Sequence, residues 1–260
     1  MKKHILLCLL CSCLPIVSYT QIYLKGYTGY ALATGSEKWS PSVIESDRNY
    51  AFSYPLKFGQ GVNLGLSIGY TLNKNIAFEI TGNTQLFSKF SYSPYEWKLE
   101  EYHWSQFFYD LEYTTTMFQL SPQIVFKSNP YKQWIFYLKG GPDFIRATYK
   151  KTTQTTPFDV PPFMYRIPSY LYTTEDSGNI NTGIQCSFGT EYKLSKNICI
   201  YAELTTVDVR YTFNRSQILR YEIDGVDALS TLESTEPDRL DYRVRFNYAG
   251  LNIGVKYNFR

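Results

Sequence analysis

The residues from Gly61 to Leu72 alternate strictly between two kinds of side chain. A period of two predicts a β-strand, because successive side chains of a strand point to opposite faces. An apolar face opposed by a small and polar face is typical of a barrel wall with lipid outside it, and less typical of a soluble sandwich. The apolar face holds Val62, Leu64, Leu66, Ile68, Tyr70 and Leu72, and the other face holds Asn63, Gly65, Ser67, Gly69 and Thr71.

Seven further segments carry the same alternation and bring the expected strand number to eight. The chain after residue 20 has no apolar run longer than five residues, which excludes a helical membrane protein. The sequence therefore predicts an all-β fold, an eight-stranded antiparallel up-and-down transmembrane β-barrel. The seven other segments are 21–31, 76–85, 118–126, 134–144, 181–194, 198–205 and 251–259.

The first twenty residues have the composition of an export signal. Lys2 and Lys3 form a basic head, residues 5–17 are mostly apolar, and the small residues Ser18 and Thr20 precede Gln21. The apolar part is shorter than the roughly 20 residues that a membrane-spanning helix needs. We expect residues 1–20 to be a cleaved signal peptide and residues 21–260 to be the barrel domain.

The turns and loops of the chain predict its sidedness. The segment from Tyr70 to Ile76 matches the segment from Tyr192 to Ile198, and each holds a tight turn between two apolar residues. A third short turn lies near 127–133, whereas the connections at 32–60, 88–115, 147–179 and 212–242 are long. Outer-membrane barrels have short periplasmic turns and long extracellular loops, and an even strand number then puts both termini in the periplasm.

Two cysteines remain after the expected signal, and the turn fixes their register. If Leu194 faces Ile198 across the second turn, Cys186 pairs near Thr206 and Cys199 pairs near Lys193. A disulfide needs Cα atoms within about 7 Å, and six residues of offset exceed that distance at about 3.3 Å each. We expect both thiols to be unpaired.

Three motifs resemble one known family. They are the segment Leu138-Lys139-Gly140-Gly141-Pro142, the turn Leu-x-Lys-Asn-Ile at residues 72–76 and 194–198, and the aromatic-rich ending from Tyr248 to Arg260. Together they resemble the small outer-membrane β-barrel domain family common in Bacteroidetes, an eight-stranded, OmpA- and OmpX-like, porin-like family. The resemblance implies a protein of the outer membrane, surrounded by lipid and lipopolysaccharide, whose last strand is read by the barrel-assembly machinery. By default we expect a monomer.

Six inward positions near one end of the strands carry charges of both signs. An eight-stranded barrel is just wide enough for side chains to fill, and charges buried there must be paired. We interpret them as a salt-bridge network that plugs the lumen, with a gate or a proton path as the alternative. The six residues are Lys25, Glu79, Lys139, Glu191, Glu203 and Lys256.

The second long connection is rich in aromatic residues. Exposed aromatic side chains can mark a surface that binds a protein or a glycan, and packing of loop on loop is the alternative. The residues of this possible recognition surface are Tyr95, Trp97, Tyr102, Trp104, Phe107 and Tyr109.

No motif in the chain predicts catalysis, a metal or a cofactor. The single histidine after residue 20, His103, has no catalytic motif around it, and the acidic residues of the fourth long connection follow no known calcium-loop spacing. Without Lys2 and Lys3 the chain has 24 basic and 23 acidic residues, which argues against nucleic acid as a partner.

The sequence therefore predicts a non-enzymatic barrel with a structural or surface-interaction role. That role could be envelope integrity, adhesion or ligand recognition by the loops. A porin-like channel for small solutes and an accessory barrel of a secretion apparatus are the alternatives, and a lipid-modifying enzyme is the least favoured.

Overall fold

The structure, a computed structural model, describes ten segments of the chain. They are residues 21–34, 37–39, 54–56, 60–87, 90–92, 95–100, 103–155, 158–160, 165–232 and 242–259. The backbone alone is described at 37–39, 54–56, 90–92, 95–100, 103–109, 111, 158–160, 165–167 and 242. The signal peptide expected at residues 1–20 lies outside the described residues. No helix among the described residues combines the length and the hydropathy needed to cross a membrane.

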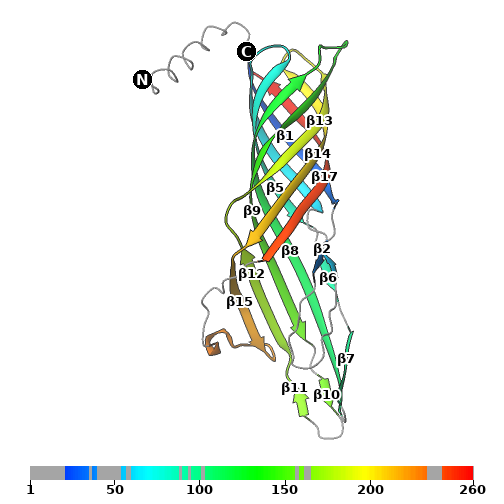
Figure 1. The fold of residues 1–260 in the computed structure, drawn as a ribbon, viewed down its shortest axis with the longest axis vertical. Helices are drawn as coiled ribbons and strands as arrows, with labels where there is room; N and C mark the ends of the chain where they lie inside the picture. The colour runs from blue at the N-terminus through cyan, green and yellow to red at the C-terminus, as the bar shows by residue number, and fades with distance from the viewer. Residues whose placement is uncertain are drawn as a thin grey trace, which may run out of the picture.

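Eight long strands pair in chain order around a closed ring (Figure 1). Each strand is antiparallel to the next, and β17 pairs with β1 to close the ring. The predicted eight-stranded up-and-down barrel is confirmed. The strands are β1 (Gln21–Ala33), β4 (Gly61–Thr71), β5 (Ile76–Phe87), β8 (His103–Lys127), β9 (Trp134–Thr155), β13 (Asn181–Lys193), β14 (Ile198–Phe213) and β17 (Tyr242–Asn258).

The two copies of the repeated turn have the same geometry. In the first, the side chain of Asn73 accepts hydrogen bonds from the backbone N–H groups of Asn75 and Ile76, at 2.9 and 2.8 Å. In the second, the Ser195 hydroxyl accepts the equivalent bonds from Asn197 and Ile198, at 3.3 and 3.1 Å. A short polar side chain at the first turn position therefore fixes both hairpins.

The register of the second hairpin agrees with the expected one. Cys186 pairs with Thr206 and Cys199 with Lys193, so the two thiols are six residues apart along the ladder. Both cysteines are free, Cys186 on the exposed outer face and Cys199 buried inside. The expectation of two unpaired thiols is confirmed.

The strands continue past the ring at the end away from the tight turns, so most of each described long connection is paired strand (Figure 1). β12 pairs with the outer half of β9 and then with β15, which makes a sheet that leaves the barrel wall. We call this sheet, formed by the outer parts of β8 and β9 with β12 and β15, the extension. Its strands and the short ones beside it are β6 (Phe90–Tyr92), β7 (Tyr95–Glu100), β12 (Tyr170–Ser177), β15 (Arg215–Ile223) and β16 (Val226–Asp227). Two separate pairs of short strands are β2 (Glu37–Trp39) with β3 (Tyr54–Leu56) and β10 (Phe158–Val160) with β11 (Tyr165–Ile167). A 3₁₀ turn at Leu229–Thr231 comes after β16.

The small and polar inward face of residues 61–72 does not extend along the whole barrel. The half of the ring nearer the extension encloses an apolar cluster, and on β14 the inward residues Tyr211 and Phe213 are fully buried while Arg210 faces out. Along β14 the apolar residues thus change from the outer face to the inner face. The reason is that the outer face meets lipid along one part of the strand and water along the rest. The cluster consists of Ala31, Tyr113, Met117, Ile145, Ala147, Tyr149, Val207, Val209, Tyr211, Phe213, Val244, Phe246 and Tyr248.

Inward glycines give space to inward tyrosines. Tyr23 is fully buried, and a Cβ atom added at Gly69 on the neighbouring strand would overlap its ring. Gly65 receives the ring of Tyr27 in the same way. Gly82 faces lipid instead, and an added Cβ there would meet nothing closer than 4.0 Å.

We predict that Gly69→Ala lowers the free energy of unfolding by about 1–3 kcal/mol, because the buried Tyr23 ring cannot move aside without strain. The matched control Gly82→Ala should change it by less than about 1 kcal/mol, since the added methyl group meets open space. Urea unfolding in detergent micelles, followed by tryptophan fluorescence, measures both. Equal losses in the two variants would contradict the close packing of Tyr23 on Gly69.

Candidate functional site

The six inward charges predicted from the alternation lie at the end of the barrel that carries the tight turns. Their side chains are at most 4% exposed. Each one enters the lumen because it occupies an inward position of its strand, next to outward apolar residues such as Leu24 and Ile80. The structure brings all six together.

The six charges form one chain of alternating sign. Glu203 binds Lys139 at 3.0 Å, and Lys139 binds Glu79 at 2.8 Å. The second oxygen of Glu79 lies 3.0 Å from the ammonium group of Lys25. Lys25 continues the chain to Glu191 at 3.4 Å, and Glu191 binds Lys256 at 2.7 Å.

None of the five links joins neighbouring strands. Glu203 on β14 and Lys139 on β9 are separated by β13 in the ring, and Lys139 and Glu79 on β5 are separated by β8. The link from Lys25 on β1 to Glu191 on β13 passes two intervening strands, β14 and β17. The chain therefore crosses the lumen, and it does not run along the wall.

Tyrosine side chains complete the surroundings of these charges. Tyr23 donates a hydrogen bond to Glu79 at 2.9 Å, and Tyr137 donates one to Glu203 at 2.8 Å. The ammonium group of Lys25 makes no well-directed hydrogen bond, but it lies 4.5 Å from the ring centre of Tyr137 and 5.0 Å from that of Tyr201. Buried ammonium groups gain stabilisation from aromatic faces at such distances.

Sequence reasoning missed Lys127, a further cation at this end of the lumen. Its ammonium group lies 4.9 Å from the ring centre of Tyr23 and 3.5 Å from the Thr71 hydroxyl. The sequence pattern suggested a turn at Lys127, although this residue continues the inward series of Gln123 and Val125 on β8. Extending the alternation by one position would have found it.

A layer of amides and hydroxyls lies between the charges and the apolar cluster. Gln119 accepts hydrogen bonds from Asn83 at 2.7 Å and from Tyr248 at 2.8 Å. Its own amide group donates to Asp143 at 3.2 Å, and Ser121 also contacts that carboxylate. Asp143 is buried and has no cation within ion-pair distance among the described residues, so its environment differs from that of the three glutamates.

The aromatic residues predicted as a recognition surface cannot be placed in the same way. The backbone pairing of β7 with β8 sets Tyr95 opposite Phe108 and Trp97 opposite Gln106, but their side chains are not described. The same holds for Trp104, Phe107 and Tyr109, which lie on β8, and Tyr102 falls outside the described residues. No group of three or more histidine, cysteine, aspartate or glutamate residues within the described segments is placed to hold a metal ion.

A closed ring with an apolar outer belt and a charged, hydrogen-bonded interior defines a transmembrane β-barrel. The chain belongs to the outer membrane protein β-barrel domain family, whose model matches residues 5–259. It is thus a protein of the bacterial outer membrane. No curated protein matches its sequence.

Several solved structures are similar to this chain at low identity. Neisserial surface protein A is 11% identical, with 93% of this chain and 100% of that chain covered and a TM-score of 0.44. A major outer membrane protein from Thermus thermophilus is 10% identical, with 92% and 99% covered and a TM-score of 0.42. The outer membrane protein OprG from Pseudomonas aeruginosa is 12% identical, with 93% and 96% covered and a TM-score of 0.41.

We predict that Lys139→Ala destabilises the barrel by about 3–5 kcal/mol, because it leaves two buried carboxylates without a shared cation. The matched control Lys196→Ala, in an exposed turn, should leave stability nearly unchanged. Loss of heat-modifiable gel migration and a lower urea midpoint measure the effect.

A double-mutant cycle tests the pairing itself. Lys139 is the only cation within 4.0 Å of Glu203 in the described part of the chain, whereas Glu79 retains Lys25. Adding Glu203→Gln to Lys139→Ala should therefore cost much less than Glu203→Gln costs alone. Additive losses would show that Lys139 and Glu203 do not act as a pair.

Proposed function

We propose that this protein is a monomeric outer-membrane barrel whose lumen is closed to solutes and whose extension serves a structural or surface-interaction role. The observation that carries the proposal is the chain of six alternating charges across the lumen. Ionic pairs between strands that are not neighbours in the ring support a lumen without a continuous water column at that level, and the apolar cluster would provide a second barrier. The role of the extension is envelope integrity, adhesion or ligand recognition.

The orientation follows from the lengths of the connections. The three tight turns and both termini lie in the periplasm, and the extension lies outside the cell. Residues 1–20 direct export and are removed, and the terminal strand is read by the barrel-assembly machinery. Short periplasmic turns and long outer loops are the common arrangement in such barrels, which supports this assignment.

We assign recognition to the hairpin that β7, beside the extension, forms with the outer part of β8. Its aromatic residues Tyr95, Trp97, Tyr102, Trp104, Phe107 and Tyr109 are of the kind that dominates protein and glycan interfaces. The occupant is a surface protein or a glycan. We assign no catalytic activity to the protein, because His103 is the only histidine after residue 20 and no motif of a lipid-modifying enzyme accompanies it.

We predict near-zero conductance for the purified barrel in a planar lipid bilayer, because buried ion pairs must separate before an ion can pass. An open porin reconstituted in parallel is the control for insertion, and heat-modifiable migration confirms folding. Free conduction by the wild type, with Lys139→Ala changing only ion selectivity, would replace the closed barrel with a porin-like channel. An accessory role in a secretion apparatus predicts co-purification with other envelope proteins.

The proposed orientation predicts different labelling of two engineered cysteines. In a background with Cys186→Ser and Cys199→Ser, a membrane-impermeant thiol reagent should label Thr155→Cys on whole cells and should not label Lys74→Cys. Lysed cells should show labelling of both, which controls for the reactivity of each site. Labelling of Lys74→Cys on intact cells would reverse the orientation.

A further inference from the structure

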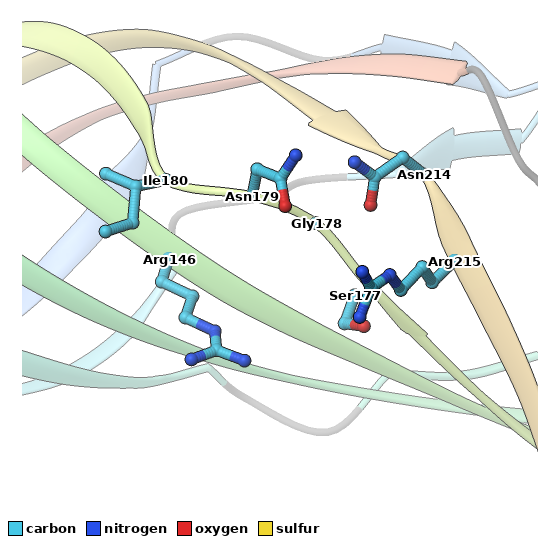
Figure 2. Close-up of a pocket in the computed structure, with 7 residues that line it drawn as sticks. All are labelled: Arg146, Ser177, Gly178, Asn179, Ile180, Asn214 and Arg215. Carbon is cyan, nitrogen blue, oxygen red and sulfur yellow. The ribbon is translucent and has the colours of Figure 1, made fainter.

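A polar pocket opens on the outer surface at the point where the extension leaves the barrel wall. It has a volume of about 200 Å³ and is lined by residues of β9, β12 and β15 and of the segments that join β12 to β13 and β14 to β15. Figure 2 shows its seven lining residues, which are Arg146, Ser177, Gly178, Asn179, Ile180, Asn214 and Arg215.

An irregularity of the strands creates this opening. Asn181 pairs with Ile145, and Ser177 pairs with Thr148. The chain therefore advances four residues between Ser177 and Asn181, where β9 advances only three. The extra residue makes a bulge that separates β12 from β13. On the other side β14 stops pairing with β17 after Phe213, and the following strand β15 pairs with β12 in the extension.

Two arginine side chains point into the pocket without a carboxylate partner. Arg146 enters from β9, and Arg215 reaches back from β15 toward Ser177 (Figure 2). No ion pair joins either guanidinium group to an acidic residue in the described part of the chain. The side-chain oxygen of Asn214 is buried there without a hydrogen-bond partner, and an amide in the opposite orientation would instead direct its N–H groups toward a ligand. Such donors suit an anion with several oxygen atoms.

The position of the pocket relative to the lipid identifies the source of the anion. Arg146 pairs with Phe118, which faces lipid at 54% exposure, and the next outward residue below it is Phe144. Ile180 lines the pocket itself and is 67% exposed. Arginines above an apolar surface match a molecule with anionic groups next to acyl chains.

Further basic residues lie on the neighbouring outer face of the barrel. Arg210 and Arg245 lie directly opposite each other on β14 and β17, and Arg243 follows on the same outer face. Asp208 and Glu175 are the nearby outward acids, and neither forms an ion pair with Arg146 or Arg215. These arginines make the outer face beside the pocket basic, which suits contact with an anionic layer.

We propose that the pocket binds a phosphate group of lipopolysaccharide, the phosphorylated glycolipid of the outer leaflet. Arg146 and Arg215 hold the phosphate oxygens, the asparagine amides contact the sugar, and the acyl chains lie along Phe144 and Ile180. The assignment rests on the proposed orientation, in which this end of the barrel faces the outer leaflet.

Native mass spectrometry of the folded full-length barrel tests the proposal with bisphosphorylated lipid A as the probe. The double variant Arg146→Gln/Arg215→Gln should bind it at least tenfold more weakly than the wild type does. Arg220→Gln is the matched control, because Arg220 lies on the same strand as Arg215 but is paired with Glu222 at 2.7 Å. Unchanged binding by the double variant overturns the proposal.

A second comparison needs no variant. The wild type should bind bisphosphorylated lipid A at least tenfold more tightly than its dephosphorylated form, and millimolar inorganic phosphate should not displace it. Equal binding of the dephosphorylated form overturns the phosphate contact. Displacement by inorganic phosphate overturns the lipid source and leaves a site for a free anion. These measurements in detergent do not depend on orientation, so failure of the thiol-labelling experiment remains distinguishable from failure of the pocket.

Discussion

A chain that crosses a bilayer by strands must satisfy every backbone N–H and C=O group within itself, and the rest of this structure depends on that requirement. The pairing of β17 with β1 leaves no open edge in the ring. With eight strands the ring is just wide enough for side chains to fill its interior, and the inward side chains of this barrel are buried. Closure of the backbone thus dictates a packed interior.

The way the interior is filled changes along the barrel axis. At the end with the tight turns, the inward positions hold ion pairs and tyrosines, because the apolar residues are needed on the lipid side. Toward the extension the outer face meets water, and aromatic residues such as Tyr211 and Phe246 become available for the inside. From the tight turns toward the extension, the interior thus has a charged layer, an amide layer and an apolar layer.

Sequence reasoning was accurate where lipid imposes strict alternation. The eight strands, the register of Cys186 with Thr206 and the inward set of six charges all follow from a period of two. It ended β14 near Thr205, whereas the strand continues to Phe213. The alternation continues there with its two faces exchanged, so a search for outward apolar residues stops too early.

The partners within the charge chain could not be predicted from the sequence. Alternation assigns each residue to a face, but it does not say that Lys25 meets Glu191 across two other strands. That contact depends on the tilt and stagger of the closed ring, which no local pattern encodes. The pocket at Arg146 and Arg215 escaped notice for a similar reason, because a single-residue bulge produces it.

The length of β8 and β9 has a mechanical consequence. β8 has 25 residues and β9 has 22, and the two pair from Tyr109 with Thr155 to Leu120 with Phe144 and again, after a short gap, from Ile124 with Gly140 to Lys127 with Tyr137. A force that pulls the far end of the extension along the strands loads this ladder in shear, so its many hydrogen bonds share the load and do not peel apart one at a time. The extension therefore resists stretching along its strands. Tension on anything attached to it is transmitted through β8 and β9 to the wall of the barrel and the membrane around it.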